Sequence, residues 1–283
     1  MRAILFKGAL LTLLLFSGTS MQAQNYQNYV REFLSTQWWL GFKVGTNFTS
    51  AMPTERFSGI SPTNYDPNSL LKAYDDYSLA GVSAGLDITF YHKGLSIGIQ
   101  PNFRRSRFSY KNELFWQGES PLQRFETDFE QLQKIDFFDI PLFFKYDLLQ
   151  KKVRPFIMVG GYFSFITNAE KELVVNQRDF SSGTVQNISS GTVNLGVTNN
   201  FEKYNYGVLG GVGVSYDFWN IRAILEASYR YGLNNVTDEN QRFAESQLVS
   251  IGDLNDNIEL RSINVSMSFV FPLRFISKQF QAF

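Results

Sequence analysis

The chain has 283 residues, with 26 basic and 26 acidic side chains and a formal net charge of zero at pH 7. Charged residues make up only 18%, below the usual quarter, and the balanced charge excludes the positive field that nucleic-acid binding requires. There is no cysteine, which excludes disulfides and thiolate metal sites.

The first 23 residues have the pattern of a secretory signal peptide. Arg2 and Lys7 form a positive start, 9–16 is apolar, and Met21-Gln22-Ala23 is a plausible cleavage site. The alternative, a buried N-terminal helix, is disfavoured by the basic start and small-residue end. We therefore expect an exported protein with a signal peptide at 1–23, a periplasmic segment at 24–36 and one domain at 37–283.

Beyond Ala23 no apolar run approaches the roughly 18 residues of a membrane helix. A membrane-embedded form would have to be a closed β-barrel, because only helices and closed sheets satisfy every backbone group in lipid. Aromatic residues reach 16%, yet the mean hydropathy is −0.17, so the apolar residues are dispersed among polar ones.

Apolar and polar residues alternate in segment after segment, which is typical of strands with two different faces. Eight segments show this pattern: 37–47, 79–91, 95–108, 138–147, 157–165, 204–216, 221–231 and 262–271. Most are near the 9–11 residues that cross a bilayer as a strand. Pro101 and Pro141 each remove a ladder donor, so both require a bulge or an end of pairing.

The connections alternate in length. Short turns are expected at 92–94, 149–152 and 217–220, and long polar loops at 49–78, 109–134, 167–203 and 233–260. This asymmetry is typical of outer-membrane barrels, with short periplasmic turns and long extracellular loops. The predicted fold is therefore all-β: a closed antiparallel transmembrane β-barrel of about eight strands, in the bacterial outer membrane. A soluble sandwich is the alternative, because alternation alone cannot distinguish a lipid-facing surface from a core.

The polar face is rich in Gly, Ser and Asn and carries charges of both signs. In a membrane barrel this face lines a narrow lumen, where buried charges must pair. We therefore predict a lumen charge network, formed by Lys43, Asp87, Arg104, Asp139, Lys145, Arg222, Glu226 and Arg230.

Four blocks carry a resemblance to a known family: 139–146 (DIPLFFKY), 153–156 (VRPF), 206–216, and 229–235 (YRYGLNN). Together they resemble the PorT-like outer-membrane β-barrel family of Bacteroidota, over most of the chain after residue 23 and most strongly over 137–235. The resemblance implies a small barrel in the outer membrane. That family includes a component required for type IX secretion.

No catalytic, cofactor or metal site is predicted. The single histidine, His92, falls in a predicted short turn, and one His without Cys disfavours a zinc site. Asp87, Asp139 and Glu226 share the inward face, but the five cations there favour ion pairing over catalysis. The acidic clusters at 75–76 and 253–256 lack calcium-loop spacing and are expected to be solvated.

The favoured hypothesis is a non-enzymatic structural or interaction barrel, and its sharper version is membership of a type IX secretion or gliding apparatus. Expected partners are outer-membrane lipids, lipopolysaccharide and other envelope or secretion-system proteins. Four loop aromatics are candidate contacts, with packing onto the barrel rim as the alternative: Phe115, Trp116, Phe180 and Phe201. The rival function is a narrow transporter or small-ligand binder that uses its charged lumen, although side chains just fill an eight-stranded barrel.

Overall fold

The computed structural model describes residues 36–57, 72–119, 123–180, 185–218, 220–243, 248 and 253–273. The predicted signal peptide at 1–23 and all but the last residue of the 24–36 segment lie outside the described residues.

Eleven strands are described, joined by two short 3-10 helices. The strands are β1 (Thr36–Glu55), β2 (Ala73–Tyr74), β3 (Ala80–His92), β4 (Leu95–Ile99), β5 (Asn102–Gln117), β6 (Arg124–Asp147), β7 (Val153–Asp179), β8 (Gln186–Gly196), β9 (Tyr204–Phe218), β10 (Ile221–Gly232) and β11 (Asn257–Pro272). The 3-10 helices are η1 (Thr198–Asn200) and η2 (Glu239–Gln241).

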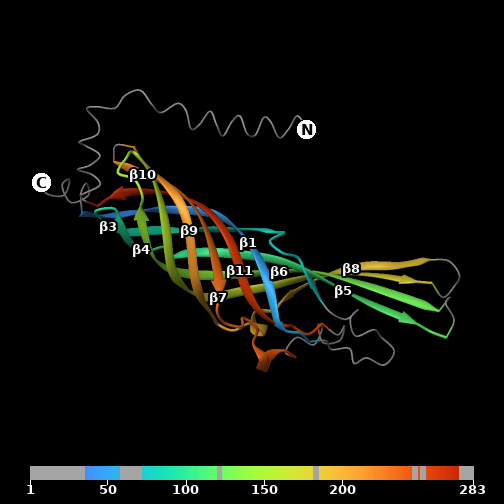
Figure 1. Cartoon of the computed structure of the whole chain (residues 1–283). Coiled ribbons are helices and arrows are strands. Elements are labelled where there is room, and N and C mark those ends of the chain that lie inside the picture. Colours follow the sequence, from blue (N-terminus) through green and yellow to red (C-terminus); the bar gives the residue numbers. More distant parts are fainter. Residues whose placement is uncertain are drawn as a thin grey trace, which may run out of the picture.

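Eight barrel strands form a closed ring of antiparallel pairs. The order is β1, β3, β4 with β5, β6, β7, β9, β10 and β11, and β11 pairs back onto β1. β4 and β5 are two pieces of one barrel strand, because both pair with β3 on one side and β6 on the other. The predicted closed barrel of about eight strands is confirmed, and Figure 1 shows these strands wrapping around one axis.

The break between β4 and β5 contains both strand prolines. Pro101 lies in the break, and Pro141 of β6 lies opposite it, where its carbonyl accepts from Gln100 N at 3.1 Å. The N–H and C=O of a strand residue point to the same neighbour, so the missing Pro141 donor also faces the break. One interruption thus accommodates both prolines, as the sequence required.

The apolar face of each barrel strand points outward. Exposed fractions reach 65% at Phe42, 62% at Val82 and 61% at Val159, while the opposite face is buried. This is the reverse of a soluble domain, where such residues would form the core. Lipid is the surrounding that would cover this belt.

The short connections lie together at one end, the short-turn end. Lys93 and Gly94, with φ of 48° and 87°, form the two-residue turn between β3 and β4, as a type I′ hairpin requires. Pairing of Thr36 with His92 and of Trp39 with Pro272 places the start of β1 and the end of β11 at this same end.

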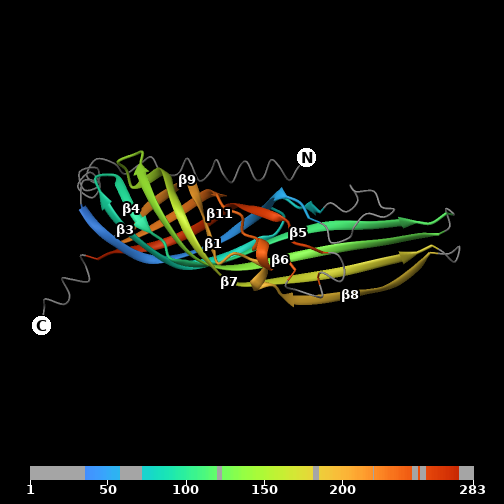
Figure 2. The same ribbon diagram turned by 90° about the horizontal axis from the view of Figure 1, so that it is seen from below.

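At the other end, β5, β6 and β7 continue past the ring and form a projecting sheet with β8 (Figures 1 and 2). We call this the arm: residues 106–117 of β5, 124–136 of β6 and 166–179 of β7, together with β8. β5 pairs with β6 out to Gln117↔Arg124, and β6 with β7 out to Phe125↔Asp179.

The predicted loops at 109–134 and 167–203 are therefore largely wrong, because most of each is strand. The outward face of the arm carries charged residues in place of apolar ones, such as Glu130 and Glu170. The alternation of apolar outward residues with polar inward residues ends there, although the strands continue.

A β-bulge lies where the arm leaves the ring. Thr167 of β7 is the extra residue, between the pairs Asp136↔Asn168 and Phe137↔Ile166, and its hydroxyl donates to Asp136 O at 3.1 Å. Bulges at barrel rims bend the strand and increase its twist. On the neighbouring strand, Arg105 donates two hydrogen bonds to Asp136, at 2.6 and 2.7 Å.

Two apolar clusters lie inside the molecule. The arm-side cluster fills the long-loop end and contains Ala51, Phe108, Tyr110, Ile135, Phe137, Ala169, Val197, Phe201, Val236, Leu248, Ile258 and Leu260. The ring-side cluster consists of Trp39, Tyr91, Phe143, Phe156, Met158, Tyr162, Leu209, Ile224 and Val270. Between and around these clusters the lumen is polar.

Candidate functional site

The strand alternation directs all eight residues of the predicted lumen charge network inward. They come from β1 (Lys43), β3 (Asp87), β5 (Arg104), β6 (Asp139 and Lys145) and β10 (Arg222, Glu226 and Arg230). Asp87 and Asp139 have no exposed surface and Glu226 has 2%. The structure divides these eight residues into three groups.

The first group centres on Asp139. Its Oδ2 accepts from Arg104 Nε at 2.7 Å and from Arg230 Nη1 at 2.5 Å. The two guanidinium groups lie against the rings of Phe137 and Tyr162, at 4.2 and 4.3 Å from the ring centroids. Three strands, β5, β6 and β10, are thus joined through one carboxylate.

The second group centres on Glu226. It accepts from Lys145 Nζ at 2.9 Å, from Ser266 Oγ at 3.3 Å and from Lys43 Nζ. Lys43 also donates to Gln100 Oε1 at 2.6 Å. This carboxylate therefore connects β1, β6, β10 and β11 across the lumen.

Asp87 joins the second group through hydrogen bonds. Gln100 Nε2 donates to it at 2.8 Å and Thr89 Oγ1 at 2.6 Å. Among the described residues no cation lies within ion-pair distance of Asp87. Gln100, which the sequence analysis did not single out, links it to Lys43.

The third group lies at the short-turn end, where Arg222 pairs with Asp217 at 2.7 and 3.3 Å. Arg154 contacts Asp217 as well, and its Nη1 is 3.8 Å from Asp147 Oδ2. The Arg222 guanidinium also lies 4.4 Å from the Trp39 ring and 4.9 Å from the Tyr91 ring.

The predicted network omits Arg154, Asp147 and Asp217. Arg154 falls in a motif block and Asp217 in a predicted short turn, whereas Asp147 lies in the predicted strand 138–147 but is not included. A signal was present in the sequence. Arg154 and Asp217 both continue the inward parity of their strands, two residues before Phe156 and two after Ser215.

These buried groups oppose a shift in the register of the strands. Removing two charges from water is costly, and the cost is offset only when geometry and further hydrogen bonds are good. A shift of one residue would turn each charge to the lipid face. The network therefore acts chiefly as an internal brace, that is, a set of buried ion pairs that joins strands across the lumen.

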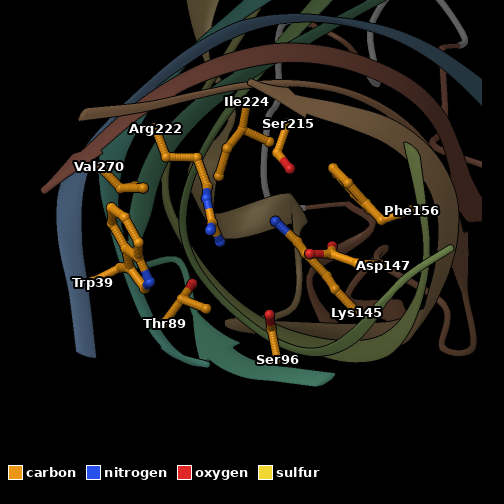
Figure 3. A pocket seen from close by; sticks show the side chains of 10 residues that line it. All are labelled: Trp39, Thr89, Ser96, Lys145, Asp147, Phe156, Ser215, Arg222, Ile224 and Val270. Atoms are coloured by element: carbon orange, nitrogen blue, oxygen red, sulfur yellow. The ribbon is translucent and has the colours of Figure 1, made fainter. Parts of the chain in front are cut away.

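Two small cavities lie in the described part of the lumen. One, of about 20 Å³, is lined by Trp39, Lys145, Asp147, Arg222 and their neighbours, whose side chains converge from the wall in Figure 3. The other, of about 30 Å³, lies beside Lys43, Gln100 and Arg104. Each is large enough for about one or two water molecules. Side chains of the ion pairs and of the ring-side cluster line both cavities.

The long-loop end holds a further buried charge cluster. Lys171 Nζ of β7 donates to Asp253 Oδ2 at 2.7 Å and to Asn255 Oδ1 at 2.9 Å. Lys72 Nζ lies 3.1 Å from Asp256 Oδ1 and 3.7 Å from Asp253 Oδ1. These contacts fasten 253–256 to the arm, together with the arm-side cluster.

The expectation that 253–256 is solvated is therefore wrong, because Asp253 and Asp256 are only 4% and 2% exposed. Burial alone would raise the pKa of the Asp253 carboxyl, but the Lys171 and Lys72 ammonium groups hold that pKa below its ordinary value. Burial lowers the pKa of Lys171. Both pKa shifts are those expected for ion pairs that are removed from water.

The four candidate loop aromatics differ in their positions. Phe201 is buried within the arm-side cluster and forms a β-bridge with Thr237, so its predicted exposure is wrong and packing at the rim holds instead. Phe180 is half-buried beneath the Arg124 guanidinium, 5.1 Å from its ring centroid. Phe115 and Trp116 lie in β5, and their side chains are outside the described residues.

His92, predicted in a short turn, is the last residue of β3 beside that turn, and Thr36 Oγ1 is 2.6 Å from its Nδ1. In the described ranges, no three His, Cys, Asp or Glu residues are grouped so that they could hold a metal ion. Nor does that part of the chain contain a helix long and apolar enough to cross a membrane.

Comparison with known proteins gives one family match. Residues 22–238 match the family described as outer membrane protein beta-barrel domain. No curated protein matches the chain.

Three solved structures are among those that match this chain. Neisserial surface protein A is 14% identical, covers 82% of this chain and 95% of its own, and gives a TM-score of 0.31. Ail of Yersinia pestis, crystallised with the heparin analogue sucrose octasulfate, is 9% identical, with 83% and 99% coverage and a TM-score of 0.30. The N-terminal barrel of Pseudomonas aeruginosa OprF is 11% identical, with 81% and 97% coverage and a TM-score of 0.22.

Proposed function

The chain belongs to the outer membrane protein β-barrel domain family, and from this premise we propose that it is a closed, non-enzymatic barrel that holds an arm for contact with other proteins. Its location is the outer membrane. The short-turn end then faces the periplasm and the arm faces outward, as in other barrels with this asymmetry.

One observation carries this proposal: the lumen is filled while the arm projects. Ion pairs and two apolar clusters occupy the interior, and the described cavities there are about 20 and 30 Å³. The arm continues β5, β6 and β7 past the ring. Such a molecule is suited to anchoring and contact rather than to passage of solutes.

The edge of the arm formed by β8 is suited to strand addition. β8 pairs with β7 on one side, and no described strand pairs with its other side. Gln186–Gly196 contains no charged residue and no proline, the usual features that prevent edge pairing. The opposite edge, β5, carries Lys111 and Glu113 and is partly covered by β2. We therefore place partner binding at β8, through main-chain hydrogen bonds.

Membership of a type IX secretion apparatus is the finer form of this proposal. It is supported by the 139–146 and 229–235 blocks of the resemblance. A secretion complex in the cell envelope would require a rigid membrane anchor and an outward contact surface. The barrel with its buried ion pairs would provide the anchor, and the arm would provide the contact surface.

The test removes the outer part of the arm, including the first half of β8, and keeps the barrel. Residues 112–129 and 175–191 are each replaced by Asn-Gly, which joins the paired positions Lys111↔Glu130 and Val174↔Thr192. Affinity purification from native outer membrane with the full chain should yield reproducible partners that the shortened chain loses. An identical set of partners for both chains would contradict the proposal.

A further inference from the structure

A groove of about 660 Å³ opens between the rim end of β7 and the segment that joins β8 to β9. Two backbone hydrogen bonds hold its walls together: Ile166 N donates to Lys203 O and Asp238 N donates to Asn200 O, both at 3.0 Å. Its volume is in the range of small-molecule sites, about 300–1,000 Å³. It is far larger than the two lumen cavities.

One side of the groove is aromatic and lies at the outer end of the membrane-spanning part. Phe165 and Tyr204 line the groove and pack with Phe163 beside it. The ring centroids are 5.1 Å apart for Phe163 and Phe165, and 5.6 Å from Tyr204 to each of them. All three are outward and exposed, and the pairing of β7 with β9 ends at Phe165↔Tyr204. Aromatic residues at this level of a barrel lie among lipid headgroups.

The other side of the groove is polar. Asn199, Glu202, Lys203 and Gln241 are exposed, and their side chains have no hydrogen-bond or ion-pair partner among the described residues. Asp238 lies beside them. Two carboxylates against one ammonium give the groove a slight negative charge, which disfavours a phosphate and suits neutral hydroxyl groups.

We propose that this groove binds the neutral sugar headgroup of an outer-leaflet glycolipid. Phe165 and Tyr204 supply amphipathic surface, and Asn199, Gln241 and Glu202 supply donors and acceptors for sugar hydroxyls. The lipid, rather than a free sugar, is the source because the groove adjoins the lipid-facing wall. Tyr206 and Val208, the next outward residues of β9, continue that wall beneath it.

The experiment uses the full chain in nanodiscs of phosphatidylcholine with a minor fraction of monoglucosyl diacylglycerol of matched acyl chains. Lipids retained by the protein are counted by native mass spectrometry. We expect enrichment of the glycolipid over phosphatidylcholine by about tenfold, as a few hydrogen bonds and one aromatic contact would give. Equal retention of the two lipids would overturn the proposal.

Two variants address the groove directly. Tyr204→Ala and the double variant Asn199→Ala with Gln241→Ala should each reduce the enrichment at least about threefold. The matched control is Tyr146→Ala, an outward tyrosine of similar exposure near the short-turn end, 52% against 49%. An equal loss in the control would contradict a site at the groove. All variants are first checked for the heat-dependent gel shift of a folded barrel.

A third measurement separates headgroup from acyl-chain recognition. Methyl β-glucoside at high concentration should displace the glycolipid, because the sugar is the recognised part. Failure to displace it would contradict sugar recognition. Preference for an anionic lipid, phosphatidylglycerol, over the glycolipid would contradict the assignment of a neutral ligand.

Discussion

Arg230 of β10 donates to Asp139 of β6 at 2.5 Å, although two other strands lie between β6 and β10 in the ring. The bond crosses the lumen and joins two walls that share no backbone hydrogen bonds. Asp139 also holds Arg104, so one carboxylate neutralises two buried cations. Through this pairing the charge network joins opposite walls of the barrel and acts as a brace.

Replacement Asp139→Asn should destabilise the barrel strongly. The amide preserves the shape but leaves Arg104 and Arg230 buried without a counter-charge, and breaking such a pair costs about 3–5 kcal/mol. Urea unfolding in lipid vesicles, followed by fluorescence, measures the loss. Asp87→Asn is the matched control, because Asp87 forms hydrogen bonds without a close cation. This variant should lose much less of the free energy of unfolding. Equal effects of the two variants would contradict the brace.

Glu226 and Lys145 should show strong coupling in a double-mutant cycle. Glu226→Gln alone leaves two ammonium groups uncompensated, whereas Glu226→Gln combined with Lys145→Met removes one of them. The double variant should therefore be more stable than the sum of the single losses predicts, with coupling of about 1–3 kcal/mol. Additive losses would show that the two side chains act independently.

Acid should release the segment 253–256 from the arm. The folded-state pKa of Asp253 lies below its ordinary value, so the carboxylate stabilises the closed segment at neutral pH. That stabilisation is present above the ordinary carboxyl range and is lost as pH falls through the lowered pKa. Hydrogen exchange of 253–257, compared between pH 7 and about pH 3, should show deprotection at low pH.

Asp253→Asn provides the control for this pH effect. The variant should be less protected at pH 7 and should change little on acidification, because the titrating group is gone. Deprotection of the same size in wild type and variant would assign the pH effect to another group.

Charged substitutions on β8 should abolish partner binding without affecting the barrel. Lysine at an edge position opposes strand addition, so Thr192→Lys with Asn194→Lys should eliminate the partners recovered by affinity purification. The control is Asn112→Lys on β5, the other edge of the arm. If both variants retain the same partners, the contact lies elsewhere; if both lose them, β8 is not the specific edge.

The sequence was sufficient to predict the ring and the inward direction of its charges, because side chains of a strand alternate with a fixed period of two. Phe42 and Lys43, neighbours on β1, point to opposite sides for this reason. The pairing of those charges could not be predicted. Which of Arg104, Lys145 or Arg230 meets Asp139 depends on strand stagger around the ring, which no local pattern determines.

The long-loop end was predicted poorly for a different reason. Lys171 and Asp253 are 82 residues apart and each lies in a stretch that appears polar and solvated. Phe201 likewise belongs to no periodic segment, yet it packs with Ile135 and Ile258 from β6 and β11. Such contacts arise only once the ring brings loop segments together.

The central claim is that the lumen is closed by its own side chains, and conductance in planar lipid bilayers tests it most directly. The full chain should show no stable openings under an applied potential, because its ion pairs and apolar clusters fill the path. Asp139→Asn and Glu226→Gln provide comparisons in which the packing is weakened. Stable, ion-selective openings of the unaltered protein would contradict the closed scaffold and would favour a narrow transporter.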